Sequence, residues 1–86
     1  MIIYILGHRC VKGDLTEELV CNVVSEEQID ATIIRISKDE KIIKFGVSLT
    51  PSVVIDGQIK AMGRIPKKDE VFSWLMHKKI PKSKAA

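Results

Sequence analysis

The sequence begins with a run of apolar residues, IIYIL at positions 2–6, followed directly by Gly7. Side chains alternate between the two faces of a sheet, so a strand with only apolar residues must be covered on both faces. Such a strand is typical of the centre of a sheet, often a parallel one, with helices on either side. The run therefore predicts an α/β fold with the first strand at its centre.

A helix and a second strand are predicted next. Apolar residues recur there at helical spacing, namely Leu15, Leu19, Val20, Val23 and Val24. They predict an amphipathic helix over residues 14–28. Asp14 followed by Glu17 resembles a capping box and favours a helix start at Asp14. Residues 31–37 are rich in branched side chains and predict a strand, in which Arg35 indicates an edge position.

The next part of the chain predicts a short helix and a hairpin. The short helix covers residues 39–45 and is ended by Gly46. Two strands at residues 52–55 and 58–62 are joined by Asp56-Gly57, which is a strong hairpin signal between branched residues. The hairpin adds two antiparallel strands to the sheet.

A last helix is predicted from Pro66 to about residue 79. Its apolar side comprises Val71, Phe72, Leu75 and Met76. The predicted order is thus strand, helix, strand, helix, hairpin, helix. Because a strand–helix–strand unit crosses over right-handed, its two strands should be parallel. The result is a four-stranded mixed sheet with helices on both faces.

Size and charge restrict the classes of function. The 86 residues, 45% of them hydrophobic, predict one packed domain over residues 1–80 and a flexible basic tail over residues 81–86. The net charge of +3 comes mostly from lysines late in the chain. No aromatic or arginine residues interleave with these lysines, so we expect a solvated surface and no nucleic-acid binding.

The first residues also bear on location. The apolar run is too short for a secretory signal or a membrane span, so we expect a cytoplasmic protein without membrane association. Cysteines normally stay reduced in that compartment. Two cysteines without a nearby histidine pair make a poor metal site, and we expect no metal and no cofactor. The protein is expected to be a monomer.

Cys10 is the candidate reactive residue. It follows the first strand at its carboxyl end, where open α/β sheets place their ligand sites. Unpaired N–H groups and the dipole at a helix N-terminus stabilise a thiolate, and Arg9 and Lys12 add positive charge nearby. If the helix starts at Asp14, however, Cys10 gains less from the dipole and has a carboxylate close to it. An ordinary loop cysteine fits the position equally well.

Cys21 lies two turns along the predicted helix. At a rise of 1.5 Å per residue, it is roughly 10 Å or more from the helix start. A disulfide requires Cα atoms no more than about 7 Å apart. We therefore expect no intramolecular bond between Cys10 and Cys21.

Three stretches together match a known family. ILGHRCVKG has a cysteine after the first strand, TPSVVIDG has Thr-Pro before the third, and MGRIP has a glycine after the fourth. The chain resembles the small thioredoxin-like or glutaredoxin-like "redox-active disulfide" proteins of the thioredoxin-fold superfamily. These proteins read I-x-G-x-x-C-x-x-C, then T-P-x-x-x-x-D-G, then G-[RK]-[VIL]. The resemblance covers the chain from residue 1 to about residue 75.

The resemblance implies a β-α-β-α-β-β-α fold with strand order 2-1-3-4. It implies that Cys10 is the attacking thiol and that Thr50, Pro51 and Gly63 bind the substrate, a protein or low-molecular-weight thiol or disulfide. It also implies a cis Thr50–Pro51 bond that faces Cys10. Without the resemblance, a trans Thr50–Pro51 bond would be expected, because only about 5–6% of X–Pro bonds in folded proteins are cis.

The chain departs from the family at Gly13, where the second cysteine of the pair would stand. In the family the first thiolate attacks a disulfide and the second thiol resolves the mixed disulfide, so here an external thiol must resolve it. The leading hypothesis is a thiol-disulfide oxidoreductase in cell redox homeostasis that works by a monothiol mechanism through Cys10. The alternative is a redox-inactive binding module that keeps the groove beside Pro51. In a third hypothesis, a partner protein or a second copy of this chain supplies the resolving thiol, in the second case through Cys21.

Overall fold

The computed structural model describes residues 1–79 of the chain. The tail predicted over residues 81–86 lies outside the described residues. The elements, in chain order, are β1 (Ile2–Leu6), α1 (Val11–Glu26), β2 (Thr32–Ile36), α2 (Asp39–Ile43), β3 (Ser52–Ile55), β4 (Gln58–Met62) and α3 (Lys68–Lys79).

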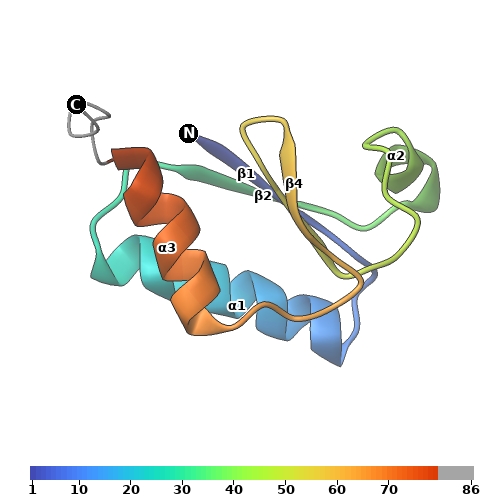
Figure 1. Cartoon of the computed structure of the whole chain (residues 1–86). Helices are drawn as coiled ribbons and strands as arrows, with labels where there is room; N and C mark the ends of the chain where they lie inside the picture. Colours follow the sequence, from blue (N-terminus) through green and yellow to red (C-terminus); the bar gives the residue numbers. More distant parts are fainter. Residues whose placement is uncertain (80–86) are drawn as a thin grey trace.

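The four strands form one mixed sheet in the order β2-β1-β3-β4 (Figure 1). Strand β1 is parallel to β2 and antiparallel to β3, and β3 is antiparallel to β4. The apolar run predicted to lie at the centre of the sheet is one of the two inner strands. Strand β2, which carries Arg35, is at an edge. The α/β fold and the strand order implied by the resemblance are therefore confirmed.

The core has two parts, one on each face of the sheet. The larger part joins Ile3 and Ile5 of β1 to apolar residues of α1 and α3. On the opposite face, Leu6 packs with Ile42 of α2 and with Val47. Figure 1 shows α1 and α3 together on one side and α2 apart from them. Helices cover both faces, as the uninterrupted apolar run of β1 required.

The hairpin between β3 and β4 forms at Asp56-Gly57, as predicted. Both residues have positive φ angles, 47° and 84°, which is the combination that a type I′ turn requires. Asp56 also connects the turn to β1. The Ile2 amide donates to the Asp56 carboxylate over 2.9 Å, and the Asp56 amide donates to the Ile2 carbonyl over 3.0 Å.

Helix α1 begins at Val11, so the predicted start at Asp14 is wrong. Cys10 is the N-cap residue, with an extended backbone (φ −148°, ψ 172°), and its carbonyl accepts the Asp14 amide over 2.9 Å. Asp14 lies within the first turn and forms no capping box with Glu17. Both carboxylates are instead bound by Arg35 of β2. An ion pair between distant segments thus replaces the local cap that the sequence suggested.

The buried face of α1 also differs from the predicted stripe. The buried residues are Gly13, Thr16, Val20 and Val23. Leu15, predicted on the apolar face, is 47% exposed. The hydroxyl of Thr16 donates to the Lys12 carbonyl over 2.8 Å, which satisfies its polar group inside the core. Small or internally bonded residues therefore bring the first turns of α1 close to the sheet.

Helix α3 begins at Lys68, later than predicted, and the buried Pro66 lies before it. Val71 and Leu75, one turn apart, are buried. Phe72, predicted on the same apolar side, is 42% exposed. Phe72 lies about 100° around the helix from Val71, because an α-helix has 3.6 residues per turn, and this rotation carries it off the buried face.

Glu70 caps the N-terminus of α3. One carboxylate oxygen accepts the Lys67 amide over 2.9 Å, and both oxygens accept from the Arg64 guanidinium over 2.6 and 2.9 Å. The hydrogen bond from Arg64, followed by that from the Lys67 amide, lowers the pKa of Glu70 from 4.5 to about 2. The same contact raises the pKa of Arg64.

We expect Glu70→Gln to lower the melting temperature at pH 7, because it removes the charged cap. Since the folded-state pKa is below the ordinary 4.5, the stabilisation is complete above that value and is lost as the pH falls through about 2. The difference in melting temperature from the wild type, followed by circular dichroism, should therefore shrink on acidification. Asp69→Asn is the matched control, since it removes a charge from the same turn without these contacts. A difference that does not change with pH would contradict this role of Glu70.

Candidate functional site

Cys10 lies at the end of the loop between β1 and α1, and it is exposed. As the N-cap residue it precedes the first turn of a 16-residue helix, and its side chain makes no capping hydrogen bond. The first turn of α1, with its unpaired amides and the positive end of the helix dipole, therefore begins directly after Cys10. Because α1 begins at Val11, Cys10 is directly adjacent to the helix. A start at Asp14 would have placed it four residues before the helix.

The carboxylates near Cys10 are paired with cations. Arg35 lies 3.1 Å from the Asp14 carboxylate and 2.7 Å from that of Glu17. Arg9 lies 3.9 and 3.7 Å from the same two groups. The negative charge of Asp14, which counted against a reactive thiol in the sequence, is thus compensated. Lys12 is exposed in the first turn of α1, two residues after Cys10.

The loop before Cys10 packs directly against the Thr50-Pro51 segment. The Thr50–Pro51 peptide bond is cis. A Cβ atom added to Gly7 would lie 3.6 Å from the Pro51 Cα and 3.7 Å from the Thr50 Cβ. The Gly63 amide donates to the Pro51 carbonyl over 2.9 Å. The structure thus brings together the loop that carries Cys10 and the residues Thr50, Pro51 and Gly63.

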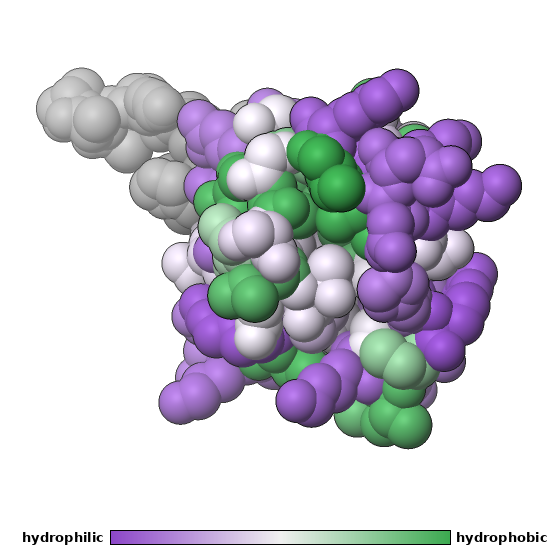
Figure 2. All heavy atoms as spheres, turned by 90° about the vertical axis from the view of Figure 1, so that its right-hand side faces the viewer, coloured by the Kyte–Doolittle hydropathy of each residue, from purple (hydrophilic) through white to green (hydrophobic). Residues whose placement is uncertain are grey.

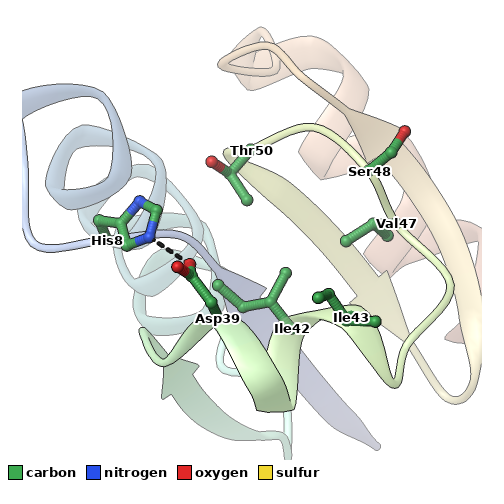
Figure 3. A pocket seen from close by; sticks show the side chains of 7 residues that line it. All are labelled: His8, Asp39, Ile42, Ile43, Val47, Ser48 and Thr50. Carbon is green, nitrogen blue, oxygen red and sulfur yellow. Dashed lines mark hydrogen bonds and ion pairs between the residues drawn. The ribbon is translucent and has the colours of Figure 1, made fainter.

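A groove of about 250 Å³ opens beside Thr50 (Figure 3). It is lined by His8, Asp39, Ile42, Ile43, Val47, Ser48 and Thr50. The His8 Nε2 atom lies 2.5 Å from a carboxylate oxygen of Asp39, which joins the loop after β1 to the first residue of α2. The groove therefore combines a His–Asp pair, two hydroxyl side chains and apolar side chains.

Exposed apolar side chains are found in the segments around this site. Val11 is 73% exposed, Ile43 67% and Leu49 60%. They belong to the start of α1, to α2 and to the segment before Thr50. Figure 2 shows the side of the molecule on which α2 lies in Figure 1, and apolar patches there are surrounded by hydrophilic surface. Apolar side chains are therefore accessible on the segments that surround the groove.

Arg35 is a site residue that the sequence did not reveal. Its side chain, only 5% exposed, reaches from β2 under the loop that carries Cys10. The Nε atom donates to the Gly7 carbonyl over 3.1 Å, and Nη2 donates to the His8 carbonyl over 2.5 Å. The sequence marked Arg35 only as an interruption of an apolar strand. That signal identified the sheet edge and did not show that the side chain points toward the thiol loop.

The other cysteine lies in a different environment. Cys21 is half-buried in α1, and it and Cys10 are both free thiols. Burial, and secondly the charge of Glu17, raise the pKa of the Cys21 thiol. Among the described residues, no group of three His, Cys, Asp or Glu side chains could hold a metal ion. None of the helices described is long and apolar enough to cross a membrane.

Comparisons with known proteins agree with this architecture. Residues 1–76 match the family model of the thioredoxin domain. A thioredoxin of Methanothermobacter thermautotrophicus is 32% identical over 71 residues, which cover 83% of this chain and 92% of that protein. A thioredoxin of Methanocaldococcus jannaschii is 35% identical over 71 residues, which cover 83% of this chain and 81% of that protein. The chain therefore belongs to the thioredoxin family.

Proposed function

We propose that the protein is a cytoplasmic thiol-disulfide oxidoreductase that acts through Cys10 alone. The observation that supports this most directly is the exposed thiol at the N-cap of α1, in the loop that packs against Thr50-Pro51. The membership in the thioredoxin family supports redox chemistry at this site. Gly13, at the position of the second cysteine, leaves no second sulfur for an intramolecular step.

The proposed cycle has two exchanges. In the first, the Cys10 thiolate attacks one sulfur of a substrate disulfide R–S–S–R′, which forms Cys10–S–S–R and releases R′–S⁻, which takes up a proton. In the second, an external low-molecular-weight thiol loses its proton and attacks the substrate sulfur of the mixed disulfide. The products are a new disulfide between R and the external thiol, and the Cys10 thiolate. The R′ half of the substrate is thus reduced to a thiol, and the external thiol is oxidised into the disulfide that it forms with the R half.

The surrounding residues would hold the substrate in place. Thr50 and Pro51 lie against the loop of Cys10, and Gly63 supports the Pro51 carbonyl, so this segment would bind the substrate backbone. The groove beside Thr50 would take the adjoining part of a protein or small disulfide. Lys12, exposed two residues after Cys10, would favour the thiolate and an anionic substrate group.

Matched cysteine variants test this proposal. The wild type, Cys21→Ser and Cys10→Ser are each mixed with oxidised glutathione at pH 7, and adducts are followed by mass spectrometry. We expect one rapid adduct in Cys21→Ser and none on the same timescale in Cys10→Ser, because burial raises the pKa of the remaining Cys21 thiol. Added reduced thiol should then release the adduct. Equal rates at the two cysteines would contradict a special role for Cys10.

The absence of a sulfur at Gly13 also favours a second candidate, a redox-inactive binding module. In that case the groove beside Thr50 docks a partner and the thiol takes no part. The Cys10→Ser variant distinguishes the two, since partner binding would persist in a binding module, whereas covalent trapping would be lost in an oxidoreductase. A disulfide-linked dimer that disappears in Cys21→Ser would instead assign the resolving role to Cys21.

A further inference from the structure

We infer that Arg35 is a positioning residue paired with Gly13: its guanidinium fills the space that a side chain at position 13 would need, and it holds the loop of Cys10. The inference goes beyond the family relationship, and its part about the reactivity of Cys10 rests on the proposed function. It predicts that adding the second cysteine to this chain is not enough to create a dithiol site.

The space at Gly13 is already occupied. A Cβ atom added there would lie 2.5 Å from Nη2 of Arg35, 3.3 Å from its Cζ, and 2.7 Å from the carbonyl oxygen of His8. All three distances are shorter than ordinary van der Waals contact. Gly13 lies inside a helix, where glycine is about 1 kcal/mol less favourable than alanine. Its helical backbone does not require glycine, so the lack of space explains the residue.

All three nitrogen atoms of the Arg35 guanidinium are engaged in hydrogen bonds. It uses Nε for the Gly7 carbonyl, Nη2 for the His8 carbonyl, and Nη1 for two carboxylates. The side chain is 5% exposed. If it moved aside for a new side chain, the buried Gly7 carbonyl and the partly buried Glu17 carboxylate would each lose a hydrogen bond, which is unfavourable. The far end of this arginine is therefore not a mobile group that yields to an added side chain.

The contacts of Arg35 lie on both sides of Cys10. The Gly7 and His8 carbonyls precede the cysteine, and the Asp14 and Glu17 carboxylates follow it on α1. A single planar group thus joins the loop to the helix across the N-cap residue. A lysine offers one point charge in place of this fork and cannot make the same set of bonds. Arg35 therefore links the loop before Cys10 to the helix after it, and its positive charge offsets the Asp14 and Glu17 carboxylates.

Whether the Arg35 guanidinium blocks a side chain at position 13 is tested in a Cys21→Ser background. Gly13→Cys, Arg35→Ala and the double variant are treated with diamide, and free thiols are then counted and intact masses measured. We expect the double variant to lose both thiols and two mass units by forming an intramolecular disulfide. We expect Gly13→Cys alone to keep most of its thiols. Equal disulfide formation in Gly13→Cys and in the double variant would overturn the inference.

The positioning of Cys10 is tested without any change at Gly13. Iodoacetamide alkylation at pH 7 is compared in the wild type, Arg35→Ala and Arg35→Lys, with Cys21 as the internal reference. We expect the Cys10 rate to fall about threefold in both variants, because the conservative lysine does not restore the fork. An unchanged Cys10 rate, or full rescue by lysine, would overturn the positioning role. Neither the diamide nor the iodoacetamide measurement requires a mixed disulfide with a substrate. Failure of the proposed function would be detected in a different experiment, in which the wild type forms no adduct with oxidised glutathione.

Discussion

Replacing Leu75 with alanine is expected to lower the free energy of unfolding by about 2–5 kcal/mol. The Leu75 side chain is fully buried in α3 and packs in the core cluster that joins α3 to α1 and the sheet. The substitution removes buried apolar groups and leaves a cavity between the layers. A chain of this size has a total stability of roughly 4–13 kcal/mol, at 0.05–0.15 kcal/mol per residue. The expected loss is therefore a large fraction of the total free energy of unfolding.

Phe72→Ala is the matched control for this prediction. Phe72 is on the same helix and is larger than leucine, but it is 42% exposed. We expect a loss of only about 1 kcal/mol, because much of its surface is already in water. Urea unfolding followed by far-UV circular dichroism measures both variants. If Phe72→Ala destabilised the protein as much as Leu75→Ala, the orientation of α3 described above would be wrong.

Gly63→Ala should destabilise the protein by about 2–4 kcal/mol, from backbone strain together with overpacking. Gly63 has a φ of +80°, which L side chains rarely adopt, and an added Cβ would lie 2.9 Å from the Leu49 Cβ. The same residue donates its amide to the Pro51 carbonyl. The substitution therefore disturbs the segment before Thr50 as well as the overall stability. Urea unfolding measures the loss.

Gly46→Ala separates the two causes. Gly46 has nearly the same angle, φ +84°, but no atom lies within 4 Å of an added Cβ. We expect it to lose only the conformational part, about 1–2 kcal/mol. Adding Leu49→Gly, which removes the contacting Cβ atom, to Gly63→Ala should recover the difference between the two glycine variants, measured relative to Leu49→Gly alone. Equal losses in Gly46→Ala and Gly63→Ala would show that contact with Leu49 does not matter.

The elements of the fold were predictable because their signals are local. The apolar run of β1 required cover on both faces, and Asp56-Gly57 marked the hairpin through its tolerance of positive φ angles. The start of α1 was not predictable in the same way. Asp14 and Glu17 have the types and spacing of a cap, but both are bound by Arg35, which lies 21 and 18 residues away.

The candidate site was predictable only in part. Cys10 was a candidate from its position after the first strand, whereas Thr50, Pro51 and Gly63 followed from a resemblance. The structure places Thr50 and Pro51 against the loop of Cys10, and Gly63 is hydrogen-bonded to Pro51. The sequence analysis did not predict the His8–Asp39 pair, because its members are 31 residues apart and no sequence motif connects them. Contacts of this kind depend on which loops the parallel strands bring to the same edge of the sheet.

From the sequence alone one could determine the order of helices and strands, the central first strand and the single thiol that follows it. Periodicity and turn chemistry act over a few residues, so they can be read along the chain. The tertiary structure decided what surrounds that thiol. Pairing β2 beside β1 places the Arg35 guanidinium against Gly13 and under the loop of Cys10, at the position of the missing second cysteine. A buried guanidinium binds whichever acceptors the fold brings within reach, and that choice depends on distances in space rather than along the sequence.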